Sequence, residues 1–389
     1  MSTLRRPDLV ALVLLLALAG GIAGHAWSST IQWKPDSLFY RSQVLRIQGM
    51  PKDEALRRVF EGPLAAPRRA GEASLPPGER KVSSAEWVRY SSRFYERRWM
   101  VPLVAAAFDP ALGARGLLAA SLLGYVLVAP LLYLLLRLWF PVRISLLVAA
   151  VCLLLFSLRT WSGLPLTDSF GLAVECLVLL AGALTLRRGG RWLALWALAV
   201  LALSFTRDAS VLAVVGGVAA FLWRRDRTSA LLALSSVAAS LPAPLLFGAP
   251  LREAMAYTLN DFFPPAHATW GFVADHYATG LRSLVRNNLT WLGDHPADAI
   301  ALVGGFVCLP LVSGLARGIR PFLIGAAATA LVYDALVPNY TGFRLELVFV
   351  PFAALGLGAL ATALEQRSLP LTARARSRAA RARGRSGGP

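Results

Sequence analysis

Apolar residues gather in long blocks that alternate along the chain with shorter polar stretches. The blocks are roughly 17 to 25 residues long, which is the length a helix needs to cross the ~30 Å hydrocarbon core of a bilayer. They predict an all-α integral membrane protein with about ten transmembrane helices. We place these helices at residues 9–28, 114–136, 142–158, 169–186, 192–206, 209–223, 229–247, 298–316, 321–337 and 345–364.

The composition agrees with this pattern, since 56% of the 389 residues are hydrophobic and only 16% are charged. An ordinary soluble domain carries about 25% charged residues. The net charge of +18 is compatible with a nucleic-acid-binding protein, but the position of the charges matters more than their sum. In a membrane protein, arginines near the ends of the transmembrane helices set the orientation of the chain.

The arginines separate into two sets of loops when the N-terminus is placed in the cytoplasm. The short loops on the opposite side carry one arginine each, namely Arg159, Arg207 and Arg344. The cytoplasmic segments carry two or three each: Arg5, Arg6, Arg137, Arg143, Arg187, Arg188, Arg191, Arg224, Arg225, Arg227, Arg317 and Arg320. Cytoplasmic loops of membrane proteins are enriched in Lys and Arg. The distribution therefore predicts that both termini are cytoplasmic.

Two long polar segments interrupt the apolar pattern, and both lie outside by the same count. The first, residues 30–111, contains amphipathic stretches at 36–60 and 83–99, where aromatic residues and arginines recur at helical spacing. Such stretches predict helices that lie in the membrane interface. Between them, residues 62–78 are rich in Pro, Ala and Gly and predict a mobile turn. The second segment covers residues 249–296.

The transmembrane domain covers residues 1–365, and residues 366–389 form a low-complexity basic tail. Such a tail cannot bury a hydrophobic core, so we expect it to be disordered and cytoplasmic. Its arginines suit binding to anionic lipid. No aromatic residue is interleaved with them, which argues against a nucleic-acid partner.

Ionisable residues at the predicted outer ends of the helices are the candidates for chemistry, because charges near the bilayer are costly. They are Asp36, Asp168, Arg207, Asp208 and Arg344. Each has a simpler interpretation, since the first two aspartates suit helix N-caps, the Arg207–Asp208 pair suits a hairpin tip, and Arg344 suits a snorkelling side chain. Their shared face nevertheless predicts one site. Its carboxylates could accept a proton or bind a divalent cation, and its arginines could bind phosphate.

Short motifs occur at four places next to the predicted helices. The long first loop opens with Asp36-Ser-Leu-Phe-Tyr40, Arg98-Trp-Met-Val-Pro-Leu precedes the second helix, Leu-Thr-Asp168 precedes the fourth, and Tyr340-Thr-Gly-Phe-Arg344 precedes the last. Together these motifs resemble the GT-C superfamily of membrane glycosyltransferases, which use polyprenyl-phosphate-linked sugars. The resemblance implies an enzyme of the plasma membrane whose active site faces away from the cytoplasm.

The resemblance also implies a role for each candidate residue. Asp36 is expected to be the catalytic base that activates the acceptor hydroxyl, and Arg207 or Arg344 to stabilise the departing lipid phosphate, with inversion at the anomeric carbon. The expected substrate-binding residues are Tyr40, Arg98, Asp168, Arg207, Asp208, Tyr340 and Arg344. The expected partners are a polyprenyl-phosphate-linked sugar and membrane lipid. No His, Asp or Glu cluster has metal-ligand spacing, so a divalent cation is compatible with the site but not implied.

Two other classes of protein remain open. A transporter or flippase of a lipid-linked or polar substrate would need charged or broken helices at mid-membrane depth. Glu175, Asp334 and the glycine pairs at 216–217 and 304–305 are candidates for such features. A non-catalytic scaffold would use the basic tail and the long loops as partner surfaces. Clustering of the candidate residues at one outer site favours the enzyme, a central two-sided cavity favours transport, and dispersal favours the scaffold.

Overall fold

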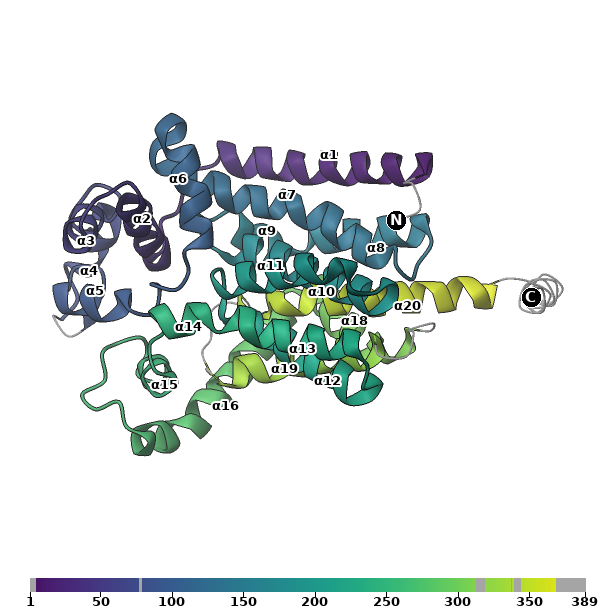
Figure 1. The fold of residues 1–389 in the computed structure, drawn as a ribbon. Helices are drawn as coiled ribbons and strands as arrows, with labels where there is room; N and C mark the ends of the chain where they lie inside the picture. The colour runs from purple at the N-terminus through teal and green to yellow at the C-terminus, as the bar shows by residue number, and fades with distance from the viewer. Residues whose placement is uncertain (1–4, 77–78, 313–318, 337, 339–343, 369–389) are drawn as a thin grey trace, which may run out of the picture.

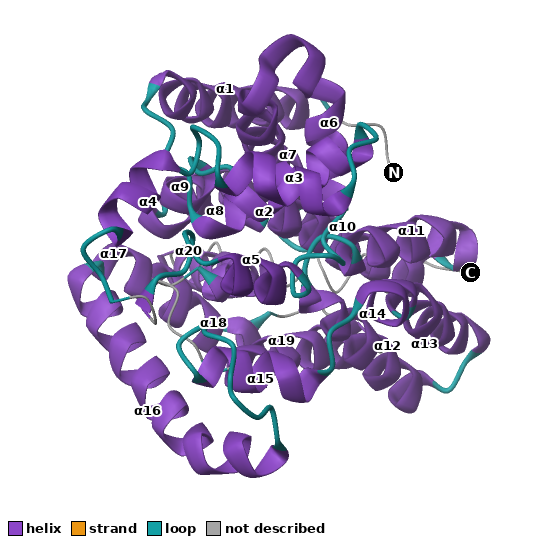
Figure 2. Cartoon of the chain, turned by 90° about the vertical axis from the view of Figure 1, so that its left-hand side faces the viewer, coloured by secondary structure: helices purple, strands orange, loops and turns teal. Residues whose placement is uncertain are grey.

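The computed structural model describes residues 5–76, 79–312, 319–336, 338 and 344–368. Helices and turns, with no strand, make up these ranges, which confirms the all-α prediction for the described part of the chain (Figure 2). Long helices run side by side through the body of the molecule, and shorter helices gather at one end (Figure 1). The start of α1 (Arg6–Ser28) and the end of α20 (Val350–Ser368) lie at the opposite end (Figure 1).

Five helical segments are long and apolar enough to cross a membrane among the residues that the structure describes. They are α1, the α6–α7 segment Met100–Leu136, α10 (Asp168–Arg188), the α13–α14 segment Arg227–Phe247, and Glu346–Arg367, which includes most of α20. The joined segments contain α6 (Met100–Leu112), α7 (Gly116–Leu136), α13 (Arg227–Ser240) and α14 (Pro242–Phe247). Helices of this length and composition indicate a membrane protein.

The other predicted spans correspond to bent or shorter helices. The predicted span 142–158 is a bent pair, in which α8 (Val142–Leu154) and α9 (Phe156–Ser162) meet at 60°. The described parts of the predicted spans 192–206, 298–316 and 321–337 overlap the shorter apolar stretches Gly190–Ser204, Pro296–Val307 and Ile319–Tyr333. These stretches contain α11 (Leu193–Ser204), α17 (Pro296–Ala299), α18 (Gly305–Val307) and most of α19 (Ile319–Leu336). The span 209–223 coincides with α12 (Val211–Arg224), whose 14 residues are shorter than the ~20 that a perpendicular span needs. The number of ten spans therefore stays a prediction.

The bend between α8 and α9 is held by a residue from a distant segment. The carboxylate of Asp298, which is 2% exposed, accepts hydrogen bonds of 2.9 Å from the backbone N–H groups of both Phe156 and Ser157. It also accepts one of 2.7 Å from the hydroxyl of Ser157. The first N–H groups of a helix have no partner within it, and its N-terminus favours negative charge. Asp298 therefore stabilises α9 as a separate helix.

α10 is the most buried of the five candidate spans. A Cβ atom at Gly124 of α7 would lie 2.4 Å from the backbone N and Cα of Phe170 in α10. Only glycine allows these two helices to approach so closely. The packing places α10 at the centre of the molecule, and α10 carries Asp168 and Glu175, each only 1% exposed, into the interior.

The described part of residues 30–99 in the first long segment folds into four helices at one end of the bundle, whereas residues 100–111, which we predicted to belong to the same outer segment, lie in α6 and join the candidate span Met100–Leu136. The four helices are α2 (Pro35–Ile47), α3 (Lys52–Phe60), α4 (Ala66–Glu72) and α5 (Ala85–Ser92). The amphipathic stretch 36–60 forms two helices, because the chain turns at Gly49, with a φ of +95°, and Pro51 directly precedes α3. The stretch 62–78 contains α4, so the described part of it is not a turn throughout.

Aromatic residues join the two long segments at this end, which faces the viewer in Figure 2. Phe39, Phe60 and Trp87 are buried and pack against one another. The second segment contributes α15 (Leu251–Leu259) and α16 (Trp270–Asp294). The ring of Tyr257 in α15 stacks on Phe94, with 4.6 Å between the ring centroids. The end helices therefore pack in small apolar clusters beside the bundle, and aromatic contacts connect the two long segments.

Candidate functional site

Asp36 lies in the first turn of α2, where its carboxylate receives two hydrogen bonds. The hydroxyl of Tyr95 donates to Oδ1 at 2.7 Å, and a guanidinium nitrogen of Arg344 donates to Oδ2 at 2.5 Å. The N-cap of α2 is Lys34, and no side chain caps it. Asp36 is therefore not the N-cap that its position after Pro35 predicts, because its side chain binds two residues from other segments.

Arg344 bridges Asp36 to a second carboxylate. Its Nε donates to Oδ2 of Asp168 at 2.7 Å, and the other oxygen of Asp168 lies 3.5 Å from a guanidinium nitrogen of Arg207. Asp168 is the first residue of α10, and the N-cap is Thr167, again without a side-chain cap. Arg207 is only 5% exposed, so it is not an exposed hairpin tip, and Arg344 does not extend freely as a snorkelling side chain would, because both carboxylates bind it. Four segments of the chain thus meet at one point.

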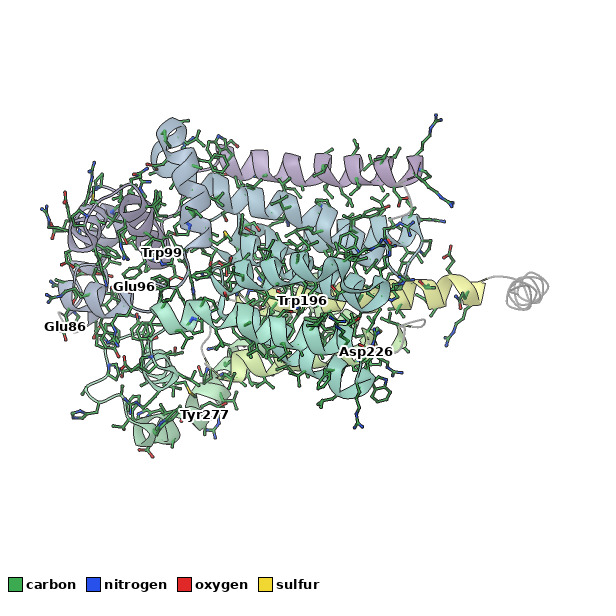
Figure 3. All side chains as sticks on the ribbon, in the orientation of Figure 1. Glu86, Glu96, Trp99, Trp196, Asp226 and Tyr277 are labelled. Atoms are coloured by element: carbon green, nitrogen blue, oxygen red, sulfur yellow. The ribbon has the colours of Figure 1, made fainter. Side chains whose placement is uncertain are left out.

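A second branch of contacts extends from the same point. Arg98 donates to the hydroxyl of Tyr40 at 2.9 Å and to Oδ2 of Asp208 at 3.2 Å. Asp208 also forms an ion pair with Arg97. The hydroxyl of Tyr40 lies 3.4 Å from Oγ1 of Thr167, next to Asp168, which connects the two branches. Figure 3 labels Glu96 and Trp99, which flank Arg97 and Arg98, at the junction between the end helices and the bundle.

The residues of both branches form what we call the polar network: Asp36, Tyr40, Tyr95, Arg97, Arg98, Thr167, Asp168, Arg207, Asp208 and Arg344. It contains seven of the eight candidate residues from the sequence. The eighth, Tyr340, lies outside the described residues. Tyr95, Arg97 and Thr167 are additions. Tyr95 belongs to the predicted aromatic stretch 83–99, but its spacing does not distinguish it from the neighbouring aromatic residues.

The charges around Asp36 keep it ionised. Burial raises the pKa of Asp36, but the positive charge of Arg344 and the hydroxyl of Tyr95 outweigh it, so the pKa lies below its usual value. Burial lowers the pKa of Arg344, but the negative charges of Asp168 and Asp36 raise it by more, so the pKa lies above its usual value and Arg344 stays protonated. Burial and the charge of Asp36 raise the pKa of Tyr95 well above its usual value, which keeps its hydroxyl a donor. Asp36 is thus an ionised carboxylate with a partner on each oxygen.

The second branch is charged in the same way. Burial raises the pKa of Asp208, but the neighbouring guanidinium groups of Arg97 and Arg98 bring it below its usual value. Several buried atoms of this branch and its surroundings nevertheless have no hydrogen-bond partner within the described residues. They are Nε of Arg98, Oδ1 of Asp208 and Oγ of Ser37. Buried polar atoms normally find partners, because an unsatisfied one costs about 1–3 kcal/mol. These donors and acceptors together suit a ligand with both phosphate and hydroxyl groups.

The residues present do not form the oxygen shell that a divalent cation takes. Within the described ranges there is no group of three or more His, Cys, Asp or Glu side chains close enough to hold a metal ion. Asp36 and Asp168 are the two carboxylates of the first branch, and the guanidinium of Arg344 binds both of them. Ca²⁺ and Mg²⁺ need about six oxygen ligands. In this arrangement Arg344 supplies the positive charge between the carboxylates.

The chain matches no protein-family model, and no curated protein is significantly similar to it. The functional argument therefore depends on the geometry of the polar network. That network has two properties of a catalytic site, namely ionised groups from separate segments in direct contact and buried polar atoms without partners among the described residues.

Proposed function

We propose that the protein is a membrane glycosyltransferase that moves a sugar from a polyprenyl-phosphate donor to an acceptor hydroxyl. The observation that carries the proposal is the direct contact between Asp36 and Arg344, residues 308 positions apart. Such a reaction needs a base and a phosphate-binding group separated by no more than the width of one sugar. Asp36 and Arg344 are close enough to meet this condition, because they are hydrogen-bonded to each other. The resemblance of the surrounding motifs to the GT-C superfamily supports the same class.

The proposed reaction is an inverting displacement at the anomeric carbon. The acceptor oxygen attacks that carbon while Asp36 takes the hydroxyl proton, and the bond between the carbon and the phosphate oxygen breaks. The lipid phosphate leaves with the bonding electron pair. Arg344 and Arg207 stabilise the charge on the phosphate, because guanidinium groups bind phosphate oxygens in pairs. Asp36 finishes the step protonated and passes its proton to water when the product leaves.

Binding of the donor would also activate the base. Without a ligand, Oδ2 of Asp36 is engaged by Arg344. A donor phosphate competes for the same guanidinium, so its arrival frees this carboxylate oxygen for the acceptor hydroxyl. Tyr95 stays on Oδ1 and fixes the orientation of the carboxylate. Because the charge of Arg344 lowers the pKa of Asp36, sharing Arg344 with a phosphate makes Asp36 a stronger base.

The arginine distribution gives the proposed orientation in the plasma membrane. With both termini in the cytoplasm, the polar network and the end helices α2–α5 lie on the non-cytoplasmic face. Lipid-linked sugars carry their phosphate at the depth of the headgroups, where the network would receive it. The predicted basic tail lies outside the described residues beyond 368.

The test is sugar transfer from a polyprenyl-phosphate donor by the purified protein in nanodiscs. We expect Asp36→Asn to lower kcat by about 10²- to 10⁴-fold while the protein still folds and binds the donor, because only the proton acceptor is lost. Asp109→Asn is a matched control. Asp109 also pairs with an arginine of α2, Arg41, but lies outside the polar network, so its change should leave kcat within about twofold.

Two results would overturn the proposal. A wild-type protein that binds no polyprenyl-phosphate-linked sugar in nanodiscs has no donor site of the proposed kind. If the wild-type protein transfers sugar and Asp36→Asn does so at the same rate, Asp36 is not the base. Loss of folding in Asp36→Asn would be recognised by its melting temperature, and Asp36→Glu, which keeps the acid, then provides the comparison.

Transport of a lipid-linked or polar substrate is the second candidate, and the broken helices favour it. α8 and α9 meet at 60°, and a π-helical turn at Ile300–Gly304 interrupts the segment between α17 and α18. Discontinuous helices occur at the substrate sites of many transporters. In proteoliposomes, movement of an intact lipid-linked sugar between leaflets, without cleavage of its phosphate bond, would replace the enzyme with the transporter.

A further inference from the structure

The side chain of Arg207 lies directly on the backbone of α10. A Cβ atom at Gly171 would be 2.5 Å from Cδ and 2.9 Å from Cγ of Arg207, far inside normal contact distance. The next nearest atom, Cγ2 of Thr206, would be at an ordinary 3.6 Å. Gly171 is thus the point at which the aliphatic part of Arg207 crosses the helix, and any side chain there would occupy the same space.

The carboxylate of Asp168 binds the far end of this side chain. Asp168 precedes Gly171 by three positions, so both residues lie on one face of α10. A guanidinium nitrogen of Arg207 lies 3.5 Å from Asp168. Arg207 therefore crosses α10 at Gly171 and reaches the carboxylate at the start of the same helix.

We propose that Gly171 is a positioning residue for the phosphate-binding arginine Arg207. Gly171 provides the path that the arginine takes across α10 to Asp168. This inference deepens the proposed function, since it assigns a purpose to a residue that does not itself touch the donor. The geometry on which it depends, the crossing of Arg207 over Gly171, is independent of the identity of the donor.

The expected effect of a side chain at position 171 is local. The atoms it would meet belong to the Arg207 side chain and not to a backbone, so the arginine moves while the helices stay in place. Gly124 offers the opposite case, because a Cβ there would meet the backbone of Phe170. Gly171→Ala should therefore change donor binding more than stability. A misplacement of about 1 Å in a reacting site can cost up to 10²-fold in rate.

The experiment is a double-mutant cycle between Gly171→Ala and Arg207→Ala, with Gly21→Ala as the matched control. A Cβ atom at Gly21, in α1, would have no atom of the described residues within 4 Å, so this variant reports only the helix propensity of alanine. The readouts are the melting temperature and the affinity for polyprenyl monophosphate in nanodiscs. In the wild-type background we expect Gly171→Ala to weaken this affinity by about tenfold to 10²-fold. It should not raise the melting temperature as Gly21→Ala does.

In the Arg207→Ala background the obstacle is gone, so Gly171→Ala should no longer reduce affinity and should raise the melting temperature to the same extent as Gly21→Ala. An equal effect of Gly171→Ala in both backgrounds would overturn the inference, because Gly171 would then act through helix packing. The melting-temperature cycle needs no substrate. If the protein binds no polyprenyl phosphate at all, the proposed function fails while the cycle still tests the path of Arg207.

Discussion

Two clusters of the same three residue types lie at opposite ends of the helix bundle (Figure 1). Near the start of α1, Asp8 accepts hydrogen bonds from the hydroxyl of Tyr133 at 2.8 Å and from Nε of Arg137 at 2.7 Å. The backbone N–H of Arg5 donates to its other oxygen. At the other end, the acid, tyrosine and arginine are Asp36, Tyr95 and Arg344.

The two clusters differ in what surrounds them. In the part of the chain that the structure describes, the side chains of Asp8, Tyr133 and Arg137 have no buried polar atom without a partner. Their cluster joins α1 to α7 and is complete in itself. Around Asp36, by contrast, a second carboxylate shares the arginine, and nearby buried atoms of Arg98 and Asp208 have no hydrogen-bond partner among the described residues. The residue types in an ion-pair cluster therefore do not distinguish a structural contact from a binding site. What distinguishes them is whether the buried polar atoms nearby have hydrogen-bond partners.

Arg344→Lys and Arg137→Lys separate the two clusters most strongly. Lysine keeps the charge but cannot bind two carboxylates, or a phosphate, with a fork of donors. Loss of two charged hydrogen bonds of about 1.5 kcal/mol each predicts about a 10²-fold lower kcat/KM for the donor in Arg344→Lys. Arg137→Lys should lower the melting temperature with kcat/KM unchanged. Steady-state kinetics with varied donor would measure both, and equal kinetic losses in the two variants would contradict the comparison.

Tyr95→Phe and Tyr133→Phe give a smaller contrast of the same kind. Each variant removes one hydrogen bond to an aspartate and leaves the ring in place. For Tyr95→Phe we expect kcat/KM to fall by about tenfold, because the carboxylate of Asp36 loses the group that orients it. For Tyr133→Phe we expect a stability loss of about 1 kcal/mol and no kinetic change. The melting temperature and kcat/KM of each variant would be measured together. A lower kcat/KM in Tyr133→Phe would contradict the assignment of the Asp8 cluster as a purely structural contact.

The smallest expected effect concerns pH. The pKa of Asp36 is lower in the folded protein than in an unfolded chain, where it is about 3.9. Its ion pair therefore adds stability that is fully present above pH ~3.9 and is lost as the pH falls through the folded-state pKa. The difference in melting temperature between the wild-type protein and Asp36→Asn should be constant from pH 7 to about pH 5 and shrink below pH ~3.9. A difference that shrinks between pH 7 and 6 would show that the folded-state pKa is raised.

The hydrophobic pattern predicted the helices well where one helix makes one long apolar block. α1 and α10 coincide with the predicted spans 9–28 and 169–186 to within three residues. The pattern did not predict the bend between α8 and α9, because its cause, the capping by Asp298, comes from a segment about 140 residues away. Apolar periodicity records burial along one element and contains no information on such a distant contact.

For the site, the rule that charges at helix ends are costly selected Asp36, Asp168, Arg207 and Arg344, and the structure brings all four together. The rule could not show how they pair. Helix capping was an equally good interpretation of the two aspartates, since it needs only the local backbone. The choice between capping and a shared site depends on which side chains from other segments lie next to the aspartates. Tyr95 was not selected for the same reason, because its role depends entirely on the position of Asp36.

The helical class, the membrane character and the side chains able to carry charge could all be read from single segments, because these properties follow from local composition and spacing. The contacts by which Arg344 joins Asp36 to Asp168 and Arg207 crosses α10 at Gly171 are visible only in the folded protein. Hydrogen bonds and close packing act over a few ångströms in space, and no single segment contains both partners. The segments that supply these residues are far apart in the sequence, and packing such as the close approach of α7 and α10 at Gly124 makes them neighbours.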